Sequence, residues 1–211
     1  MTEAVTPGPR ADMVRNRRLL LEAATAAFAE HGVDVPIGEI AQRAGLAKGT
    51  VFRHFASKED LLAAITLRML DQLLDTADRL VTADDADAAL EEFMADGVEV
   101  LAADRAFCEV IGRPSLQHVE VRDAIDRLCD AAEALTARAR ESGAVRADVT
   151  GTDIVLLLGG IQQTAAPVLG ADPQAWRRFL QLALDGLRVV GGRELPHPLP
   201  GRLDLDPAGP A

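Results

Sequence analysis

The chain has 211 residues, of which 48% are hydrophobic and 26% are charged, and it carries a formal net charge of −11. This length allows one large domain or two small ones, and the first thirty residues lack the continuous apolar core of a signal peptide. The longest apolar run, residues 154–161, is too short to span a bilayer, so we expect a cytoplasmic protein without a membrane-spanning helix.

The cysteines and the absence of known catalytic motifs both argue against an enzyme and against a metal-binding protein. Cys108 and Cys129 are too few for a disulfide framework, and no CxxC pair predicts a zinc site, so we expect reduced thiols, no metal and no cofactor. The sequence contains no GxSxG, no HExxH and no glycine-rich dinucleotide fingerprint. It therefore predicts that the protein is not an enzyme.

The first helical pattern runs from Asp12 to Glu30 and follows residues 1–11, whose turn-forming composition predicts a flexible arm. Pro36 opens a second helix, because its missing N–H costs nothing in the first turn, and Gly45 ends that helix after about two turns. A third short helix is predicted at residues 47–55.

The two short helices meet the packing demands of a helix-turn-helix unit. Ala41 supplies the small side chain that is needed where the two helices cross. Gly45 supplies a turn residue that can adopt positive φ, and Val51 returns an apolar side chain to the core. The sequence therefore predicts a helix-turn-helix whose second helix enters the major groove of DNA.

The rest of the chain is predicted to be helical, which makes the fold all-α. Ser57, with Asp60 three residues later, predicts the capped start of a long helix that reaches about residue 82. Asp84, Ser115 and either Thr150 or Thr152 are expected N-caps of later helices. Those later helices are predicted at residues 84–102, 104–112, 115–141, 151–169 and 173–191. The proline-rich residues 193–211 are expected to form a disordered tail.

Charge is distributed unevenly along this helical chain. Residues 1–60 hold equal numbers of basic and acidic side chains, so residues 61–211 carry the whole net charge of −11. Within the first part, residues 41–58 contain four basic side chains and no acidic one. Because an acidic body repels nucleic acid, we predict that any DNA binding is confined to this basic segment. A solvated basic face on a helical bundle is the alternative interpretation.

Side chains at the start of the third helix have the chemistry to contact base pairs. Lys48 and Arg53 can donate hydrogen bonds to guanine O6 and N7, and Thr50 can contact a base edge or a thymine methyl group. Gly49 allows the backbone to approach DNA closely. Lys58 lies in the first turn of the long helix, where a bound phosphate would offset its unfavourable position in the helix dipole.

Residues 36–62, PIGEIAQRAGLAKGTVFRHFASKEDLL, resemble the DNA-binding signature of the TetR/AcrR family of bacterial transcriptional regulators, and the resemblance extends over about residues 12–62. It implies a three-helix DNA-binding domain, residues 12–56, and a helical effector-binding and dimerisation domain, residues 57–192. By position it implies base contacts from Lys48, Thr50 and Arg53. It also implies backbone contacts from Phe52, His54 and Lys58, although Phe52 replaces the common tyrosine and lacks its hydroxyl.

The function implied by this resemblance is a ligand-responsive regulator, most simply a repressor, that binds a palindromic operator on double-stranded DNA as a homodimer. A helical protein that organises DNA without a ligand is the alternative. Candidate effector-pocket residues are Phe93, Met94, Leu101, Phe107, Cys108, His118, Gln162 and Gln163. Candidate residues of the dimer interface are Leu156, Gly159, Gly160, Gln163, Phe179, Leu180, Ala183, Leu184 and Leu187.

Overall fold

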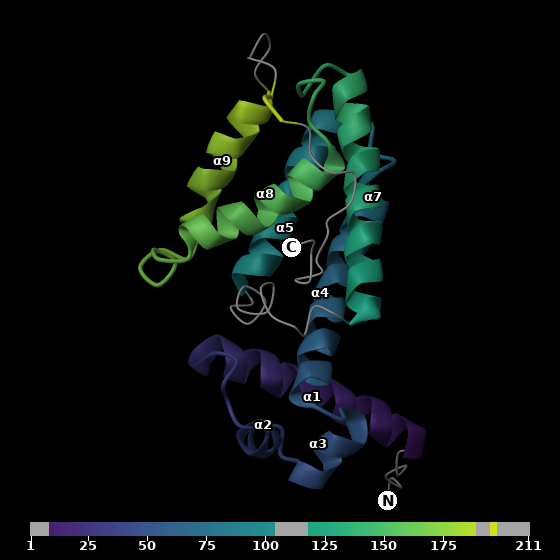
Figure 1. The fold of residues 1–211 in the computed structure, drawn as a ribbon, viewed down its shortest axis with the longest axis vertical. Helices are drawn as coiled ribbons and strands as arrows, with labels where there is room; N and C mark the ends of the chain where they lie inside the picture. The colour runs from purple at the N-terminus through teal and green to yellow at the C-terminus, as the bar shows by residue number, and fades with distance from the viewer. Residues whose placement is uncertain (1–8, 104–117, 189–194, 198–211) are drawn as a thin grey trace, which may run out of the picture. The chain divides into compact units, whose positions relative to one another are not determined.

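A computed structural model describes residues 9–103, 118–188 and 195–197 of the chain, and within these ranges it contains eight helices and no strand (Figure 1). The helices are α1 (Pro9–His31), α2 (Ile37–Arg43), α3 (Lys48–His54), α4 (Lys58–Leu80), α5 (Ala86–Ala103), α7 (Val119–Glu141), α8 (Gly151–Ala165) and α9 (Trp176–Leu187). The all-α fold predicted from the sequence is confirmed. The helix predicted at residues 104–112 lies outside the described residues.

The chain divides into two compact units, and the division falls within α4, after Ile65. The domain boundary predicted between residues 56 and 57 coincides with the start of α4 and not with this division. Of the helices in the described ranges, none combines the length with the apolar character that a bilayer-spanning segment needs.

The core of the first unit follows the apolar pattern of α1 and of the two short helices. Leu20, Ala24 and Phe28 recur on one face of α1 and are all buried, as their spacing predicts. Ala41 from α2 and Val51 from α3 are buried as well. The helix-turn-helix prediction is confirmed at the level of these packed helices, since α2 contacts both α1 and α3.

The turn between α2 and α3 is a glycine-dependent helix stop. Gly45 has φ of 67°, a left-handed conformation that glycine adopts without steric cost. The N–H of Leu46 donates to the carbonyl of Ala41 at 2.9 Å, and the N–H of Gly45 donates to the carbonyl of Gln42 at 3.0 Å. This pair of hydrogen bonds is the Schellman arrangement, which satisfies carbonyls at the end of α2 and turns the chain into α3.

Helix starts are decided by local hydrogen bonds, and several of the predicted ones are confirmed. The N–H of Asp60 donates to Ser57 Oγ and the N–H of Ser57 donates to Asp60 Oδ2, both at 3.0 Å, which is the predicted capping box. Thr150 caps α8 through the equivalent exchange with Asp153. In contrast, α1 begins at Pro9, three residues earlier than predicted, because proline is well tolerated in a first helical turn.

Two other predicted starts are wrong. Asp85, and not Asp84, accepts hydrogen bonds from the N–H groups of Asp87 and Ala88 at 3.0 Å, so the chain enters α5 one residue later. Pro173 precedes α9 instead of lying in its first turn, because residues 166–175 form turns before the helix begins at Trp176. The expected cap at Ser115 lies outside the described residues.

In the second unit, α8 packs against α5, α7 and α9. The closest approach is at Gly151, the first residue of α8, where an added Cβ would lie 2.2 Å from the backbone nitrogen of Glu133 on α7. Gly97 on α5 makes room for the side chain of Leu158 in the same way. Two glycines therefore set how closely α8 can approach its two neighbours.

Arginine side chains tie several ends of these helices together. Arg138 on α7 donates to the backbone carbonyls of Leu80, Val81 and Ala83, which lie where α4 ends and its regular hydrogen bonding stops. Arg146 pairs with Asp148 and holds the pKa of that carboxyl down at about 2. Asp148 also accepts a hydrogen bond from the N–H of Leu195 at 3.0 Å.

Apart from residues 195–197, the predicted tail lies outside the described residues.

Candidate nucleic-acid interface

The outward face of α3 carries the side chains that the sequence predicts for DNA contact. Lys48, Gly49, Phe52 and Arg53 are exposed and share one side of the helix because they are spaced at i, i+1, i+4 and i+5. Phe52 is 48% exposed, which is a large apolar surface to leave in water. Nothing lies within 4 Å of the position that a Cβ of Gly49 would occupy, so this face is open to an approaching surface.

Thr50 lies on the other side of α3 and contacts another predicted DNA-binding residue. Its side chain belongs to the buried set, with only 9% exposed. Its Oγ1 accepts a hydrogen bond from Nη2 of Arg53 at 3.0 Å, one turn further along the helix. The hydroxyl of Thr50 thus holds the guanidinium of Arg53, whereas the direct base contact expected from Thr50 stays a prediction.

The end of α3 is surrounded by cationic side chains. The guanidinium of Arg17, from α1, lies 4.6 Å from the ring centre of the buried Phe55. Partial burial and the positive charges of Arg17 and Arg53 lower the pKa of His54, which favours the neutral imidazole at neutral pH. A neutral imidazole still carries one N–H, so His54 can donate a hydrogen bond to a phosphate oxygen without being charged.

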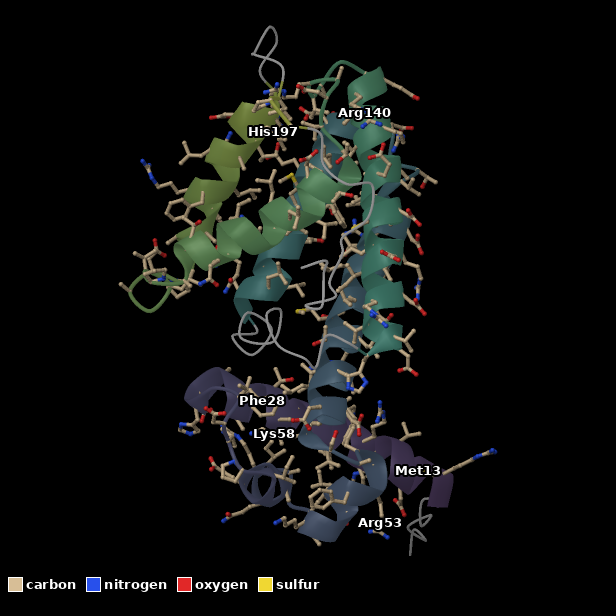
Figure 2. The ribbon with its side chains drawn as sticks, viewed as in Figure 1. Met13, Phe28, Arg53, Lys58, Arg140 and His197 are labelled. Carbon is tan, nitrogen blue, oxygen red and sulfur yellow. The ribbon has the colours of Figure 1, made fainter. Side chains whose placement is uncertain are left out.

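Lys58 and Arg43 belong to the same basic segment, but their surroundings differ. The Nζ of Lys58 lies 6.0 Å from the ring centre of Phe28. Both residues are labelled in Figure 2. Arg43 instead forms a two-pronged ion pair with Glu30, at the end of α1, and the hydrogen bond lowers the pKa of that carboxyl. The charge of Arg43, which the sequence analysis counted as part of the basic segment, is therefore neutralised within the protein.

The predicted effector residues separate into buried and exposed groups. Phe93, Met94 and Leu101 on α5 and Gln162 on α8 are buried, and Oε1 of Gln162 has no hydrogen-bond partner among the described residues. Gln163 is exposed, which places it on the outer surface of α8. His118 directly precedes α7 and is half-buried. Phe107 and Cys108 lie outside the described residues.

The predicted dimer residues also divide into buried, half-buried and exposed groups. Leu180, Leu184 and Leu187 on α9 are buried within the second unit, together with Trp176, because these four residues follow the helical period and form the inner face of α9. Contact of these three leucines with a second copy stays a prediction, since within the single subunit they already pack against other helices. Phe179 and Ala183 are half-buried at the margin of that face.

The outer face of α8 and α9 is built from other residues. On α8 it contains Leu156, Gly160 and Gln163, and on α9 it contains Leu182, which is 59% exposed and which the sequence analysis missed. The sequence does contain a signal that identifies Leu182 as outward-facing. The large apolar side chains at helical spacing in α9 are Trp176, Leu180, Leu184 and Leu187, and Leu182 lies on the opposite side of the helix from them. Added Cβ atoms at Gly159, Gly160 and Gly186 would meet nothing within 4 Å.

Comparisons with known proteins match both units. A profile of bacterial regulatory proteins of the tetR family matches residues 20–65, and a profile of the C-terminal domain of SbtR-like transcriptional regulators matches residues 85–189. The chain is 42% identical over 65 residues to the HTH-type transcriptional repressor KstR2 of Mycobacterium tuberculosis. That match takes in 30% of this chain and 32% of KstR2, so it spans about a third of this curated relative.

Two solved structures are similar over most of their length. The TetR transcription regulatory protein of Mycobacterium vanbaalenii is 34% identical with a TM-score of 0.61, and the match covers 86% of this chain and all of that one. The TetR transcriptional regulator SCO0520 of Streptomyces coelicolor is 30% identical with a TM-score of 0.59, covering 82% of this chain and 98% of that one. This chain, with its helix-turn-helix and its helical second unit, therefore belongs to the TetR family of bacterial transcriptional regulators.

Proposed function

We propose that this regulator represses transcription by binding a palindromic operator as a homodimer, and that a small-molecule effector controls the binding. The observation that carries the proposal is the outward face of α3, where Lys48, Phe52 and Arg53 are exposed and residues 41–58 contain no carboxylate. Such a face suits insertion into a major groove. The repressor function of KstR2, as its name states it, supports repression over activation.

Support for a homodimer comes from the outer face of α8 and α9. Two adjacent glycines inside a helix cost about 2 kcal/mol relative to alanine, and among the described residues neither Gly159 nor Gly160 has a neighbour that an added Cβ would meet. Leu156 on α8 and Leu182 on α9 are also exposed, at 46% and 59%. A second copy that packs a helix closely against this surface accounts for both the glycines and the exposed leucines, and a dimer presents two copies of α3 to two half-sites.

The DNA-binding proposal is tested by comparing two substitutions in the basic segment. Arg53→Ala is expected to cost about 1–3 kcal/mol of operator binding and to flatten the preference at one base pair in each half-site, because its guanidinium reads a base edge. Lys58→Ala is expected to weaken binding to all sequences alike and to reduce its salt dependence. Mobility shifts with the upstream region of the protein's own gene, and with single base-pair variants of it, measure both effects.

Arg43→Ala combined with Glu30→Gln is the matched control, because it removes both charges of an ion pair within the protein and leaves the net charge unchanged. We expect it to change operator affinity less than either of the other two substitutions. If Arg53→Ala preserved discrimination between the operator variants, Arg53 would not be a base-reading residue.

Support for an effector site comes from the buried amide of Gln162. Its side chain is 2% exposed, and a buried carbonyl oxygen without a donor costs about 1–3 kcal/mol. Gln162 lies one turn beyond Leu158, which packs against Gly97 on α5, the helix that also carries the buried Phe93 and Met94. A largely apolar effector with one hydrogen-bond donor satisfies this oxygen, and the affinity gained in the bound state shifts the protein towards that state.

Gln162→Met is expected to stabilise the protein without ligand by about 1–3 kcal/mol, since methionine fills a similar volume and has no unsatisfied amide. The unfolding midpoint is expected to rise by about 2–4 °C for each kcal/mol. Gln72→Met is the control, because Gln72 is exposed on α4 and its replacement is expected to be neutral. A lower midpoint for Gln162→Met would mean that the amide is already satisfied, which would remove this support for an effector.

A further inference from the structure

The outer face of α9 carries two opposite charges on either side of one exposed leucine. Arg178, Leu182 and Asp185 are spaced at i, i+4 and i+7, and all three are exposed on the side of α9 opposite the buried Leu180 and Leu184. At a rise of about 1.5 Å per residue, Arg178 lies about 6 Å before Leu182 and Asp185 lies about 4.5 Å after it. The pattern along this face is therefore positive, apolar, negative.

Both charged groups have hydrogen-bonding capacity for a partner outside the chain. Among residues 9–103 and 118–188, no hydrogen bond or ion pair involves the guanidinium of Arg178. The neighbouring Arg177, in contrast, lies 4.5 Å from the ring centre of Trp176 and donates a hydrogen bond to Gln174. Asp185 accepts one hydrogen bond from Gln181 at its Oδ1, which leaves the remaining acceptor positions of the carboxylate available.

The order of these charges is self-complementary in one orientation only. If two copies of α9 pack antiparallel about a two-fold axis at Leu182, residue 182−k of one copy lies opposite residue 182+k of the other. Arg178 then lies within about 1.5 Å along the axis of the other copy's Asp185, and the same pair forms again on the other side. A parallel arrangement places like charges opposite each other, which is unfavourable.

We propose that Arg178 of each copy pairs with Asp185 of the other across the dimer axis, and that these two pairs set an antiparallel α9 register and select a second copy of this chain as partner. The proposal rests on the homodimer proposed above and adds its register and its specificity. The exposed Leu156 and Leu182 and the glycines of α8 supply contact area. The charges of Arg178 and Asp185 disfavour pairing with a partner helix whose charges follow a different order.

Charge reversal tests the register directly. Arg178→Glu and Asp185→Arg each replace two attractive pairs by two repulsive ones, so each variant alone is expected to raise the dimer dissociation constant at least tenfold in sedimentation equilibrium. An equal mixture of the two variants restores both pairs in the heterodimer, and the double variant restores them in the homodimer. In both cases the dimer dissociation constant is expected to return to within about threefold of the value for the unchanged protein, because opposite charges again face each other.

Arg177→Glu is the matched control, since it makes the same charge change one residue away, at a side chain held by Trp176 and Gln174. We expect it to alter dimerisation less than threefold, and circular dichroism confirms that each variant is folded. Single variants that dimerise normally, or a mixture that stays dissociated, would overturn the register while leaving the homodimer in place. A monomeric unchanged protein would overturn both, and would reassign this face to another partner.

Discussion

Replacing Leu184 with glutamate is expected to unfold the second unit, whereas the same replacement at Leu182 is expected to leave the subunit folded and monomeric. Leu184 is 3% exposed, and a carboxylate buried without a partner at this position costs several kcal/mol. Leu182 is 59% exposed, so its glutamate is solvated in the single subunit but lies at the proposed two-fold axis in a dimer. The same substitution at two positions of α9 thus separates an effect on folding, at the inner face, from an effect on dimerisation, at the outer face.

The Leu182→Glu variant is also expected to bind the operator at least about 100-fold more weakly, although α3 is unchanged. In a dimer, once one DNA-reading unit is bound, the second binds its half-site as an intramolecular step. Losing the dimer therefore removes a gain in operator affinity of about 10²–10⁴. Circular dichroism, sedimentation velocity and mobility shifts separate the two outcomes. A Leu182→Glu protein that remained dimeric would move the interface away from the outer face of α9.

Gly151→Ala is expected to cost about 3–5 kcal/mol of folding free energy, a large effect for one methyl group. The added Cβ would lie 2.2 Å from the backbone nitrogen of Glu133, 2.5 Å from its Cα and 2.8 Å from the carbonyl carbon of Ala132. These are backbone atoms of α7, so no side-chain rotation relieves the clash and the two helices must separate. The hydrogen bond from the Gly151 N–H to Oε2 of Glu133, at 2.6 Å, is strained by the same movement.

Thermal unfolding followed by circular dichroism measures this effect, which corresponds to a midpoint lowered by about 6–20 °C. Gly38→Ala is the control, because Gly38 lies in a helix and its added Cβ would meet nothing within 4 Å. Alanine there is expected to be neutral or to stabilise by up to about 1 kcal/mol. Equal midpoints for Gly151→Ala and the unchanged protein would show that α8 can shift without loss.

The effector control proposed above has a physical route through α4, α7 and α8, made of one continuous helix, hydrogen bonds and helix packing. Residues of α4 contribute to both compact units, since the division between the units falls after Ile65 within that helix. The carbonyls at its far end are held by Arg138 from α7, which packs directly against α8. Any effector bound near Gln162 on α8 therefore acts on elements that are linked through α7 to the end of α4.

The sequence alone determined the features that depend on neighbours a few residues apart. The Ser57–Asp60 capping box, the Thr150 cap and the turn at Gly45 follow from side chains and backbone groups within one helical turn, which any helical context preserves. The same holds for the basic segment that ends in α3, because its residue types and spacing are readable without a fold. The Gly45 turn, the Ser57–Asp60 box and the basic segment also lie within residues 36–62, which carried the family resemblance.

Only the tertiary structure decided which side of each helix faces inward and which charges are already paired. Thr50 was predicted to face DNA and Leu184 to face a second copy, but both are turned inward by the packing of their helices. Arg43 is neutralised by Glu30, thirteen residues earlier in the chain. Neither outcome follows from local spacing, because a helix has the same period whichever way it is rotated. Its phase is set by contacts with distant elements.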